Sequence, residues 1–343
     1  MEICMNNKRF NLMCLTASVL LSCSLAAEAK ESLKFQINVN AGDEQFKVAQ
    51  SWAEAITQKS NGELAVELLP SSSIVNNNET LDAVGMNIIQ GHITDPSYFA
   101  GKNPAFAVFG NMVGAWSDPS QFLGYMRNSG GEERYNALVE PYNVHLIRAG
   151  ALSPEALVSK RKIEKLDDFK GLKIRAPEGM VSNIFKLAGA APVTLPTSEV
   201  YTALEKGVID AADYTVFATN YTQGYYKYAP YAAYPGFHSM PMMAISINKS
   251  VWDGLSKDNQ NLLVTESDVF IEKLNQELKA ADLAEVAIAK KKGDVTISTL
   301  SPEELVKFRN VAKEEWIRWR EKSPEAKEAI DTITAYLKDN GLL

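Results

Sequence analysis

Apolar and polar positions alternate along the first ninety residues in a pattern that predicts strands separated by helices. Residues 33–39 and 64–68 alternate with a period of two, which indicates strands with one buried face. Residues 46–56 have the spacing of an amphipathic helix. Asn76 and Glu79 have capping-box spacing before a second helix that reaches residue 88. The amino-terminal part is therefore expected to fold as β-α-β-α.

The same alternation is clearest between residues 171 and 214. Leu172 and Ile174 alternate with Lys173 and Arg175 as in a strand. Helices between short strands predict parallel crossovers, and ligands bind beyond the carboxyl ends of such strands. Arg175 and Asp213 are both expected at such ends. The predicted elements are a strand at 172–175, a helix at 180–187, a strand at 192–195, a helix capped by Ser198 and a strand at 209–214.

The remaining pattern predicts an α/β protein of two lobes. Residues 91–114 are expected to be irregular, and residues 257–292 form one helical pattern without proline or glycine, long enough to lie across both lobes. Strands are expected at 144–149, 152–159, 245–247 and 295–297, with two final helices beginning at Ser301 and Ser323. The expected division is lobe I at residues 30–150 with 240–285, and lobe II at residues 151–239 with 286–343.

The amino terminus reads as a secretion signal. Lys8 and Arg9 precede an apolar stretch at 12–25, and Ala27-Glu28-Ala29 fits the cleavage rule. The expected signal peptide is therefore residues 1–29, with a periplasmic mature chain from Lys30. All three cysteines lie in this segment, so the mature chain has no disulfide, thiol nucleophile or cysteine-bound zinc. A less favoured alternative is a lipoprotein signal that places a lipid anchor on Cys23.

Charge and chemistry narrow the function classes. The net charge of −7 argues against a nucleic-acid-binding protein. The sequence has no G-x-S-x-G or H-E-x-x-H motif, and its three histidines are scattered. Glu155 and Asp213 could act as the carboxylate pair of a secreted hydrolase, which is the weaker alternative. Arg175 offers a planar fork of donors that matches a carboxylate, although it could instead pair with Asp213.

Five segments together resemble the solute-binding proteins of tripartite ATP-independent periplasmic (TRAP) transporters, the DctP-like family. The resemblance implies two α/β lobes with a ligand cleft between them, a hinge of crossing strands and a long helix behind both. It also implies a small organic acid as ligand and a membrane permease as partner. The segments are GKNPAFAVFG (101–110), DDFKGLKIRAPEGMV (167–181), TLPTSEVYTALEKGVIDAADY (194–214), YPGFHSMP (234–241) and INKSVWDGLS (247–256).

The resemblance also implies roles for particular residues. Arg175 matches the arginine that binds the ligand carboxylate, and Asp213-Tyr214 match an acidic-aromatic pair in the cleft of keto-acid and lactate binders. Glu155 lies near the position of a glutamine that contacts ligand or metal. Glu155 and Asp213 could thus bind a calcium or sodium ion, or could instead be solvated or paired with Arg175.

Further ligand contacts are expected from residues with an equally plausible structural role. His238 could donate a hydrogen bond to the ligand, and Asn220 is a weaker candidate. Phe237, Tyr98 and Tyr214 could form apolar walls, or could simply pack in the core.

The expected function is therefore capture of a small organic acid without chemistry. The ligand is expected to be a monocarboxylate, such as a 2-oxo, 2-hydroxy or aromatic acid, that the protein delivers to the permease. The same fold could instead pass its closed state to a receptor, as a sensor.

Overall fold

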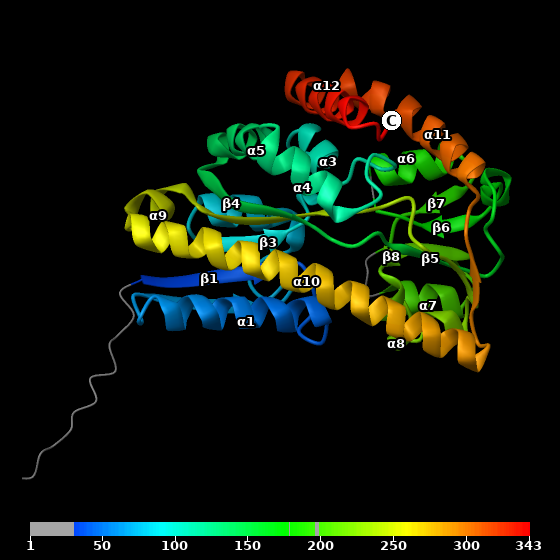
Figure 1. The fold of residues 1–343 in the computed structure, drawn as a ribbon, viewed down its shortest axis with the longest axis horizontal. Coiled ribbons are helices and arrows are strands. Elements are labelled where there is room, and N and C mark those ends of the chain that lie inside the picture. The colour runs from blue at the N-terminus through cyan, green and yellow to red at the C-terminus, as the bar shows by residue number, and fades with distance from the viewer. Residues whose placement is uncertain (1–30, 178, 196–198) are drawn as a thin grey trace, which may run out of the picture.

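The computed structural model describes residues 31–177, 179–195 and 199–343. The predicted signal peptide and the proposed cap at Ser198 lie outside these residues. The described chain forms two separate sheets with helices around them (Figure 1). The first sheet contains β1 (Glu31–Ile37), β2 (Leu64–Leu69), β3 (Gly91–Thr94), β4 (Val144–Ala151) and β10 (Met242–Asn248). The second contains β5 (Ala156–Ser159), β6 (Lys173–Arg175), β7 (Ala191–Val193), β8 (Ala211–Thr215), β9 (Tyr231–Ala233) and β11 (Thr296–Ser298).

The first sheet has the strand order β2-β1-β3-β10-β4. Strand β1 is parallel to β2 and β3, and β10 is antiparallel to β3 and β4. Phe35 of β1 is fully buried and meets Trp52 of helix α1 (Glu44–Lys59), with 5.2 Å between ring centroids. The residues that alternate with a period of two therefore form strands β1 and β2 of a parallel β-α-β unit, and the predicted β-α-β order is confirmed. The chain leaves β1 and β3 at the same edge of the sheet.

The second sheet has the strand order β11-β9-β5-β8-β6-β7. Strand β6 is parallel to both β7 and β8, which confirms the predicted crossovers through α6 (Met180–Leu187) and α7 (Val200–Glu205). Strands β5 and β8 are antiparallel, and their register shifts between Ala156 and Val158. Because Ala156 pairs with Thr215 and Val158 with Ala212, two residues of β8 oppose one of β5. This arrangement is a β-bulge, which re-aims side chains.

Two connections join the sheets and run side by side. One leads from β4 to β5 through residues 152–155, and the other leads from β9 to β10 through residues 234–241. The Leu152 amide donates to the Pro241 carbonyl at 2.9 Å, and the Glu155 amide donates to the Ser239 carbonyl at 2.9 Å. These bonds hold the two crossings together, as expected for a hinge of crossing strands.

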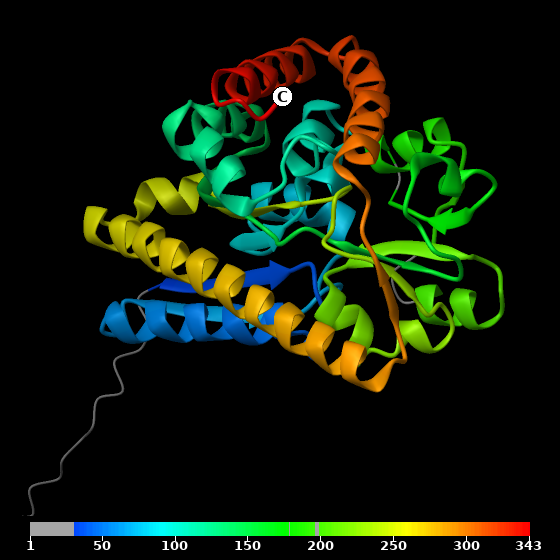
Figure 2. The same ribbon diagram turned by 45° about the vertical axis from the view of Figure 1, so that its right-hand side comes forward.

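A single long helix lies across both sheets. Helix α10 (Lys257–Lys292) contacts α1 and β4 on the side of the first sheet and α8 (Phe217–Thr222) on the side of the second. Figures 1 and 2 show it crossing the molecule from α9 to below α8. The predicted helix at 257–292 is thus confirmed. The other helices are α2 (Thr80–Gly85), α3 (Ala105–Gly110), α4 (Pro119–Asn128), α5 (Gly131–Val139), α9 (Lys249–Gly254), α11 (Pro302–Arg320) and α12 (Pro324–Asp339).

Three predictions of single elements differ from the structure, and one helix packs elsewhere than in its expected lobe. Residues 91–114, expected to be irregular, contain β3, helix α3 and the 3-10 helix η2 (Pro96–Phe99). The strand expected at 152–159 begins only at Ala156, because residues 152–155 cross between the sheets. Asp213, expected at the carboxyl end of a strand at 209–214, is the middle residue of β8 (Ala211–Thr215). Helix α12, expected with lobe II, packs against α3 beside the first sheet, while α11 packs against α6. The lobe boundaries themselves stay a prediction.

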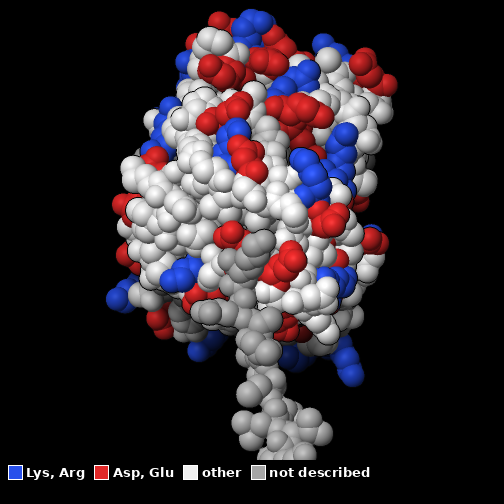
Figure 3. All heavy atoms as spheres, turned by 90° about the vertical axis from the view of Figure 1, so that its left-hand side faces the viewer, with Lys and Arg blue, Asp and Glu red and all other residues white. Residues whose placement is uncertain are grey.

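Among the described residues no helix could cross a membrane, and one end of the molecule shows charges of both signs. Within residues 31–343 as described, no helix is long and apolar enough to cross a membrane. Figure 3 shows one end of the molecule, where Lys and Arg side chains are interspersed with Asp and Glu side chains. This face lacks the single-sign basic patch that nucleic-acid binding uses.

Candidate functional site

Arg175 is the last residue of β6, at the edge of the second sheet. Its side chain is only 8% exposed. Nε donates to the Leu195 carbonyl at 3.2 Å, and Nη1 donates to the main-chain carbonyl of Asp213 at 2.6 Å. Among the described residues, no carboxylate forms a salt bridge with Arg175. The guanidinium is therefore fixed by the backbone and is not neutralised by the Asp213 carboxylate, contrary to the pairing considered from sequence.

Asp213 and His238 form a buried pair beside this arginine. The distance from His238 Nε2 to Asp213 Oδ1 is 2.8 Å, and both side chains are almost completely buried. Asp213 and Tyr214 are the two residues of the β8 bulge. Because a bulge breaks the regular alternation of side chains, it explains how adjacent residues both serve one site. His238 packs near Phe185 and Phe237, and its Nδ1 atom is buried without a partner among the described residues.

Glu155 completes a group of three side chains that could act as metal ligands, with Asp213 of β8 and His238. Glu155, Asp213 and His238 each place one ligand-type atom within 4.8 Å of the others. Glu155 and His238 lie on the two neighbouring connections, and Gly236 makes their close approach possible. A Cβ atom at Gly236 would lie 2.2 Å from the Glu155 carbonyl oxygen. The structure thus brings together three of the residues selected from sequence.

The pKa values of the two acids in this group are shifted in opposite directions. Burial raises the pKa of Glu155 well above its usual value, and the charge of Asp213 adds to this shift. Burial is also the largest single influence on Asp213 and raises its pKa. His238, the hydrogen bond with Glu155 and the charge of Arg175 together outweigh it, so the pKa of Asp213 lies below its usual value. Of these two acids, Asp213 therefore loses its proton at the lower pH and Glu155 at the higher pH.

The first sheet contributes Asp95, a residue that the sequence reading missed. Asp95 directly follows β3, caps η2 and accepts a 2.8 Å hydrogen bond from the Ser97 amide. Burial raises the pKa of Asp95 to about 6, and the charge of Asp213 contributes to the rise. The sequence feature that could have indicated Asp95 is an Asp-Pro pair directly after a strand of apolar residues. Binding sites often form at the carboxyl ends of such strands.

Tyr98, predicted as a wall of the site, comes from the same side of the molecule. It belongs to η2 and is 40% exposed. Burial of its hydroxyl raises the pKa of Tyr98, while the charge of Arg175 opposes the rise. The charge of Arg175, in the second sheet, therefore influences a residue that follows a strand of the first sheet.

The other selected residues have mainly structural contacts. Tyr214 is half-buried and packs edge-on against Tyr225, with 4.9 Å between ring centroids. Phe237 packs edge-on against Phe308 at 5.0 Å. Asn220 is fully buried and donates to the carbonyls of Ala156 and Thr215, at 3.1 and 2.9 Å. Asn220 thus fixes the ends of β5 and β8. It is not one of the three clustered residues Glu155, Asp213 and His238.

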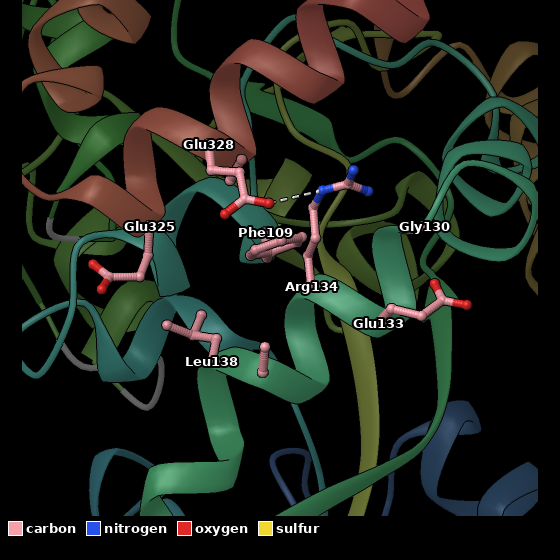
Figure 4. A pocket seen from close by; sticks show the side chains of 9 residues that line it. Phe109, Gly130, Glu133, Arg134, Leu138, Glu325 and Glu328 are labelled. Atoms are coloured by element: carbon pink, nitrogen blue, oxygen red, sulfur yellow. Dashed lines mark hydrogen bonds and ion pairs between the residues drawn. The ribbon is translucent and has the colours of Figure 1, made fainter.

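Two surface hollows lie away from this site. One, of about 350 Å³, lies between α5 and α12, where Arg134 Nε meets Glu328 Oε1 at 3.2 Å (Figure 4). The other, of about 810 Å³, lies between α11 and α12. Arg134 is paired with an acid, whereas Arg175 has no such pair among residues 31–177, 179–195 and 199–343, so the chemistry for a carboxylate favours the site at Arg175.

Comparison with known proteins identifies the family. The model of the bacterial extracellular solute-binding protein, family 7 (DctP) matches residues 35–322. A TRAP periplasmic solute binding protein from Rhodobacter sphaeroides, in an apo open structure, is 43% identical, with a TM-score of 0.78 over 91% of this chain and 99% of that chain.

Two further relatives carry named ligands. The monocarboxylate 2-oxoacid-binding periplasmic protein of Nostoc sp. is 28% identical over 222 residues, which are 64% of this chain and 60% of that protein. A TRAP periplasmic solute binding protein from Colwellia psychrerythraea, with bound calcium and pyruvate, is 20% identical and covers 92% of this chain and 95% of that chain, with a TM-score of 0.77. At this identity the second likeness shows the fold alone.

These matches confirm the resemblance that the sequence motifs indicated, including the two-lobed α/β fold. Family 7 consists of periplasmic proteins that bind solutes for transport and are not enzymes. The chain therefore belongs to family 7 of the bacterial extracellular solute-binding proteins, the DctP family of TRAP transporters.

Proposed function

We propose that this chain captures a small organic acid through Arg175 and delivers it to the membrane permease of a TRAP transporter. The observation that carries the proposal is a buried guanidinium fixed by two main-chain carbonyls and paired with no described carboxylate. Such a group offers a charge-assisted, planar contact to a carboxylate. Its position between polar groups of both sheets suits a ligand that closes two lobes on each other.

The proposed ligand is a monocarboxylate, with 2-oxo, 2-hydroxy and aromatic acids as the classes to test first. The Nostoc relative, named for a monocarboxylate 2-oxoacid, supports this class. Tyr98 and Tyr214 are the proposed aromatic walls, from the two sides of the site. We further propose that residues 1–29 are removed on export, without a lipid on Cys23, and that the bound acid undergoes no reaction.

We also propose that Glu155, Asp213 and His238 form no calcium or sodium site in this chain. Calcium takes six to eight oxygen ligands, and the side chains of this group supply two carboxylates and one imidazole nitrogen. Asp213 Oδ1 already lies at hydrogen-bond distance from His238, and the Asp213 carbonyl already accepts from Arg175. Although the Colwellia protein holds calcium with pyruvate, we propose that this chain binds its acid without either ion.

The test of the proposed function compares two arginines that the structure anchors in the same way. Arg309 of α11 donates to the carbonyls of Gly114 and Leu342, at 2.9 and 2.6 Å. Wild-type chain (residues 30–343), Arg175→Lys and Arg309→Lys are first screened by thermal unfolding against a panel of organic acids. Ligand at one hundred times its dissociation constant adds about 2.7 kcal/mol to stability.

Calorimetric titration with the acid that stabilises the wild type then gives the decisive comparison. We expect Arg175→Lys to bind about 100-fold more weakly, because lysine cannot supply the planar fork. Arg309→Lys should keep the wild-type affinity. An Arg175→Lys variant that binds as tightly as the wild type would refute the assignment of Arg175.

A further inference from the structure

We infer that Asn111 is a positioning residue of the proposed site, because its side chain fixes the connection of residues 234–241 and, through this connection, Glu155. The inference deepens the proposed function, on which its consequence for ligand affinity rests. Asn111 directly follows α3 and therefore joins a helix beside the first sheet to a segment that crosses between the sheets.

The side-chain amide of Asn111 contacts the connection at two adjacent residues. Its Nδ2 donates to Ser239 Oγ at 2.7 Å, and its Oδ1 accepts from the Met240 amide at 3.4 Å. A main-chain N–H can only donate, so the atom that faces Met240 must be the oxygen, which fixes the orientation of the Asn111 amide. Asn111 and Ser239 are both buried, so the loss of either partner leaves a polar atom without water to replace it.

Ser239 carries this contact to the other connection. Its main-chain carbonyl accepts from the Glu155 amide at 2.9 Å. Its side chain is also a hydrogen-bond partner of the Glu155 carboxyl group: burial raises the pKa of Glu155, and this hydrogen bond opposes the rise. Because Ser239 Oγ accepts from Asn111, its own proton can be donated to Glu155. Asn111, Ser239 and Glu155 therefore form one chain of hydrogen bonds.

The same end of α3 contacts the turn that contains Asp95. A Cβ atom at Gly110 would lie 2.5 Å from the Ser97 amide nitrogen and 2.6 Å from Asp95 Oδ1, so only glycine allows this approach. Gly110 thus meets η2, and Asn111, the next residue, meets the connection. The end of α3 therefore supports two segments that carry residues of the proposed site.

Loss of the Asn111 contact should loosen the placement of Glu155 and His238 without changing the fold. Groups that are held in place before binding lose little freedom when a ligand arrives. A complex with looser contacts dissociates faster, while its association rate changes little. One buried hydrogen bond of this kind corresponds to about a tenfold change in affinity.

Asn248 supplies a matched control at the other end of β10. It is also buried, accepts from the Val251 amide at 3.0 Å and donates to the Val84 carbonyl at 2.8 Å. Asn248→Ala should lower stability about as much as Asn111→Ala does, without a change at the connection. Ser239→Ala removes the Asn111 bond from the partner side and carries the test if Asn111→Ala does not fold.

The first measurement needs no ligand. Amide hydrogen exchange is followed by NMR on the isotope-labelled mature chain and its variants. We expect the Glu155 amide to exchange at least about tenfold faster in Asn111→Ala and in Ser239→Ala than in Asn248→Ala, because local opening sets the exchange rate. Equal rates in the three variants would overturn the inference, whatever acid the protein binds.

The second measurement uses pyruvate, lactate and benzoate, one acid from each proposed class. Calorimetry and stopped-flow kinetics are recorded with the acid that binds the wild type most tightly. We expect Asn111→Ala and Ser239→Ala to bind about tenfold more weakly, mainly through faster dissociation, and Asn248→Ala to match the wild type. The double variant should lose no more affinity than either single variant, because both changes remove the same bond.

The outcomes separate this inference from the proposed function. If Arg175→Lys loses binding while Asn111→Ala and Ser239→Ala bind as the wild type does, the inference is overturned and the proposed function stands. An equal loss of affinity in Asn248→Ala would also overturn it, since stability alone would then explain the effect. If the wild type binds none of the three acids but Glu155 exchanges faster as expected, the positioning role stands and the proposed ligand classes are contradicted.

Discussion

At the residue scale, main-chain contacts fix the residues that we propose to bind the ligand. Arg175 is oriented by two carbonyls, and Glu155 is placed by the hydrogen bond between its amide and Ser239. Ser239 in turn accepts from Asn111 at 2.7 Å, which joins the connection to the end of α3. Groups that are already positioned lose little conformational freedom on binding, so more of the contact energy appears as affinity.

Gly236 is the residue on which this placement depends most closely. Gly236→Ala should displace residues 234–239 from Glu155, because the new Cβ would lie 2.2 Å from a main-chain oxygen. We expect at least a tenfold loss of acid affinity and a lower Tm, on the order of the 1–3 kcal/mol that overpacking costs. Calorimetry and thermal unfolding measure the two effects.

Gly101→Ala is the control, since nothing lies within 4 Å of the Cβ it would add. This variant should match the wild type in both measurements. Wild-type affinity in Gly236→Ala would mean that the position of Glu155 does not matter for the ligand.

Metal removal tests whether Glu155, Asp213 and His238 bind an ion together with the acid. The wild-type chain is dialysed against chelator in sodium-free buffer and titrated with its acid, before and after addition of calcium or sodium. Since His238 already occupies an oxygen of Asp213, we expect the affinity to stay the same within about twofold under all conditions. Affinity that falls on dialysis and returns with calcium would show that the carboxylates bind the ion with the acid.

At the element scale, helix α10 fixes the segment that follows the β8 bulge. Asp282 of α10 is buried and accepts a 2.7 Å hydrogen bond from the Ala218 amide, in the first turn of α8. No side chain of the preceding residue caps α8, so the long helix supplies the acceptor. The contact holds α8, and with it Asn220, against the ends of β5 and β8.

Asp282 should make stability depend on pH. Burial raises its pKa from 3.8 to about 6, so the folded chain takes up this proton at a higher pH than the unfolded chain does. The contribution of Asp282 to the free energy of unfolding therefore rises as the pH falls from about 6 to about 4, by up to about 3 kcal/mol. Above pH 6 the buried charge lowers stability.

Asp282→Asn removes this titration, and urea unfolding between pH 4 and pH 8 measures the change. The difference in unfolding free energy between wild type and variant should shift in favour of the wild type as the pH falls through 6. Asp258→Asn, at an exposed position in the first turn of α10, is the control and should track the wild type. A pH-independent difference for Asp282→Asn would contradict the shifted pKa.

The elements with strong periodicity could be predicted from sequence, and those without it could not. Helix α10 and the crossovers at β6 have clear spacing, and Ser301 caps α11 as its Ser-Pro-Glu-Glu sequence indicated. Helix α3 was missed because all six of its residues are buried, which leaves no polar face to reveal a helical period. The β8 bulge was missed because register depends on the partner strand.

In the candidate site, the sequence could predict only a residue whose side chain suggests a role without knowledge of its neighbours in space. Arg175 could be selected because a guanidinium at a strand end suits a carboxylate. Its bond to the Asp213 carbonyl spans 38 residues, and the Asp213–His238 pair spans 25, so neither follows from local pattern. Asn220 was selected for its polarity, but its amide serves the backbone of two strands.

At the scale of the whole molecule, two connections and one long helix link the two sheets. Glu155 and His238 lie on the connections, so the proposed ligand contacts lie where the chain passes between the sheets. Gln223 of the second lobe also donates to Asp43, beyond β1, at 3.3 Å. A ligand that contacts both sides can therefore shift the balance between open and closed arrangements through its different contacts in each.

The most direct test of this account is the crystal structure of the chain bound to the acid that stabilises it. We predict one carboxylate at hydrogen-bond distance from the Arg175 guanidinium, with the rest of the ligand between Asp95, Glu155 and Tyr98. An acid bound between α5 and α12 at Arg134, with Arg175 contacting only its two carbonyls, would contradict the account.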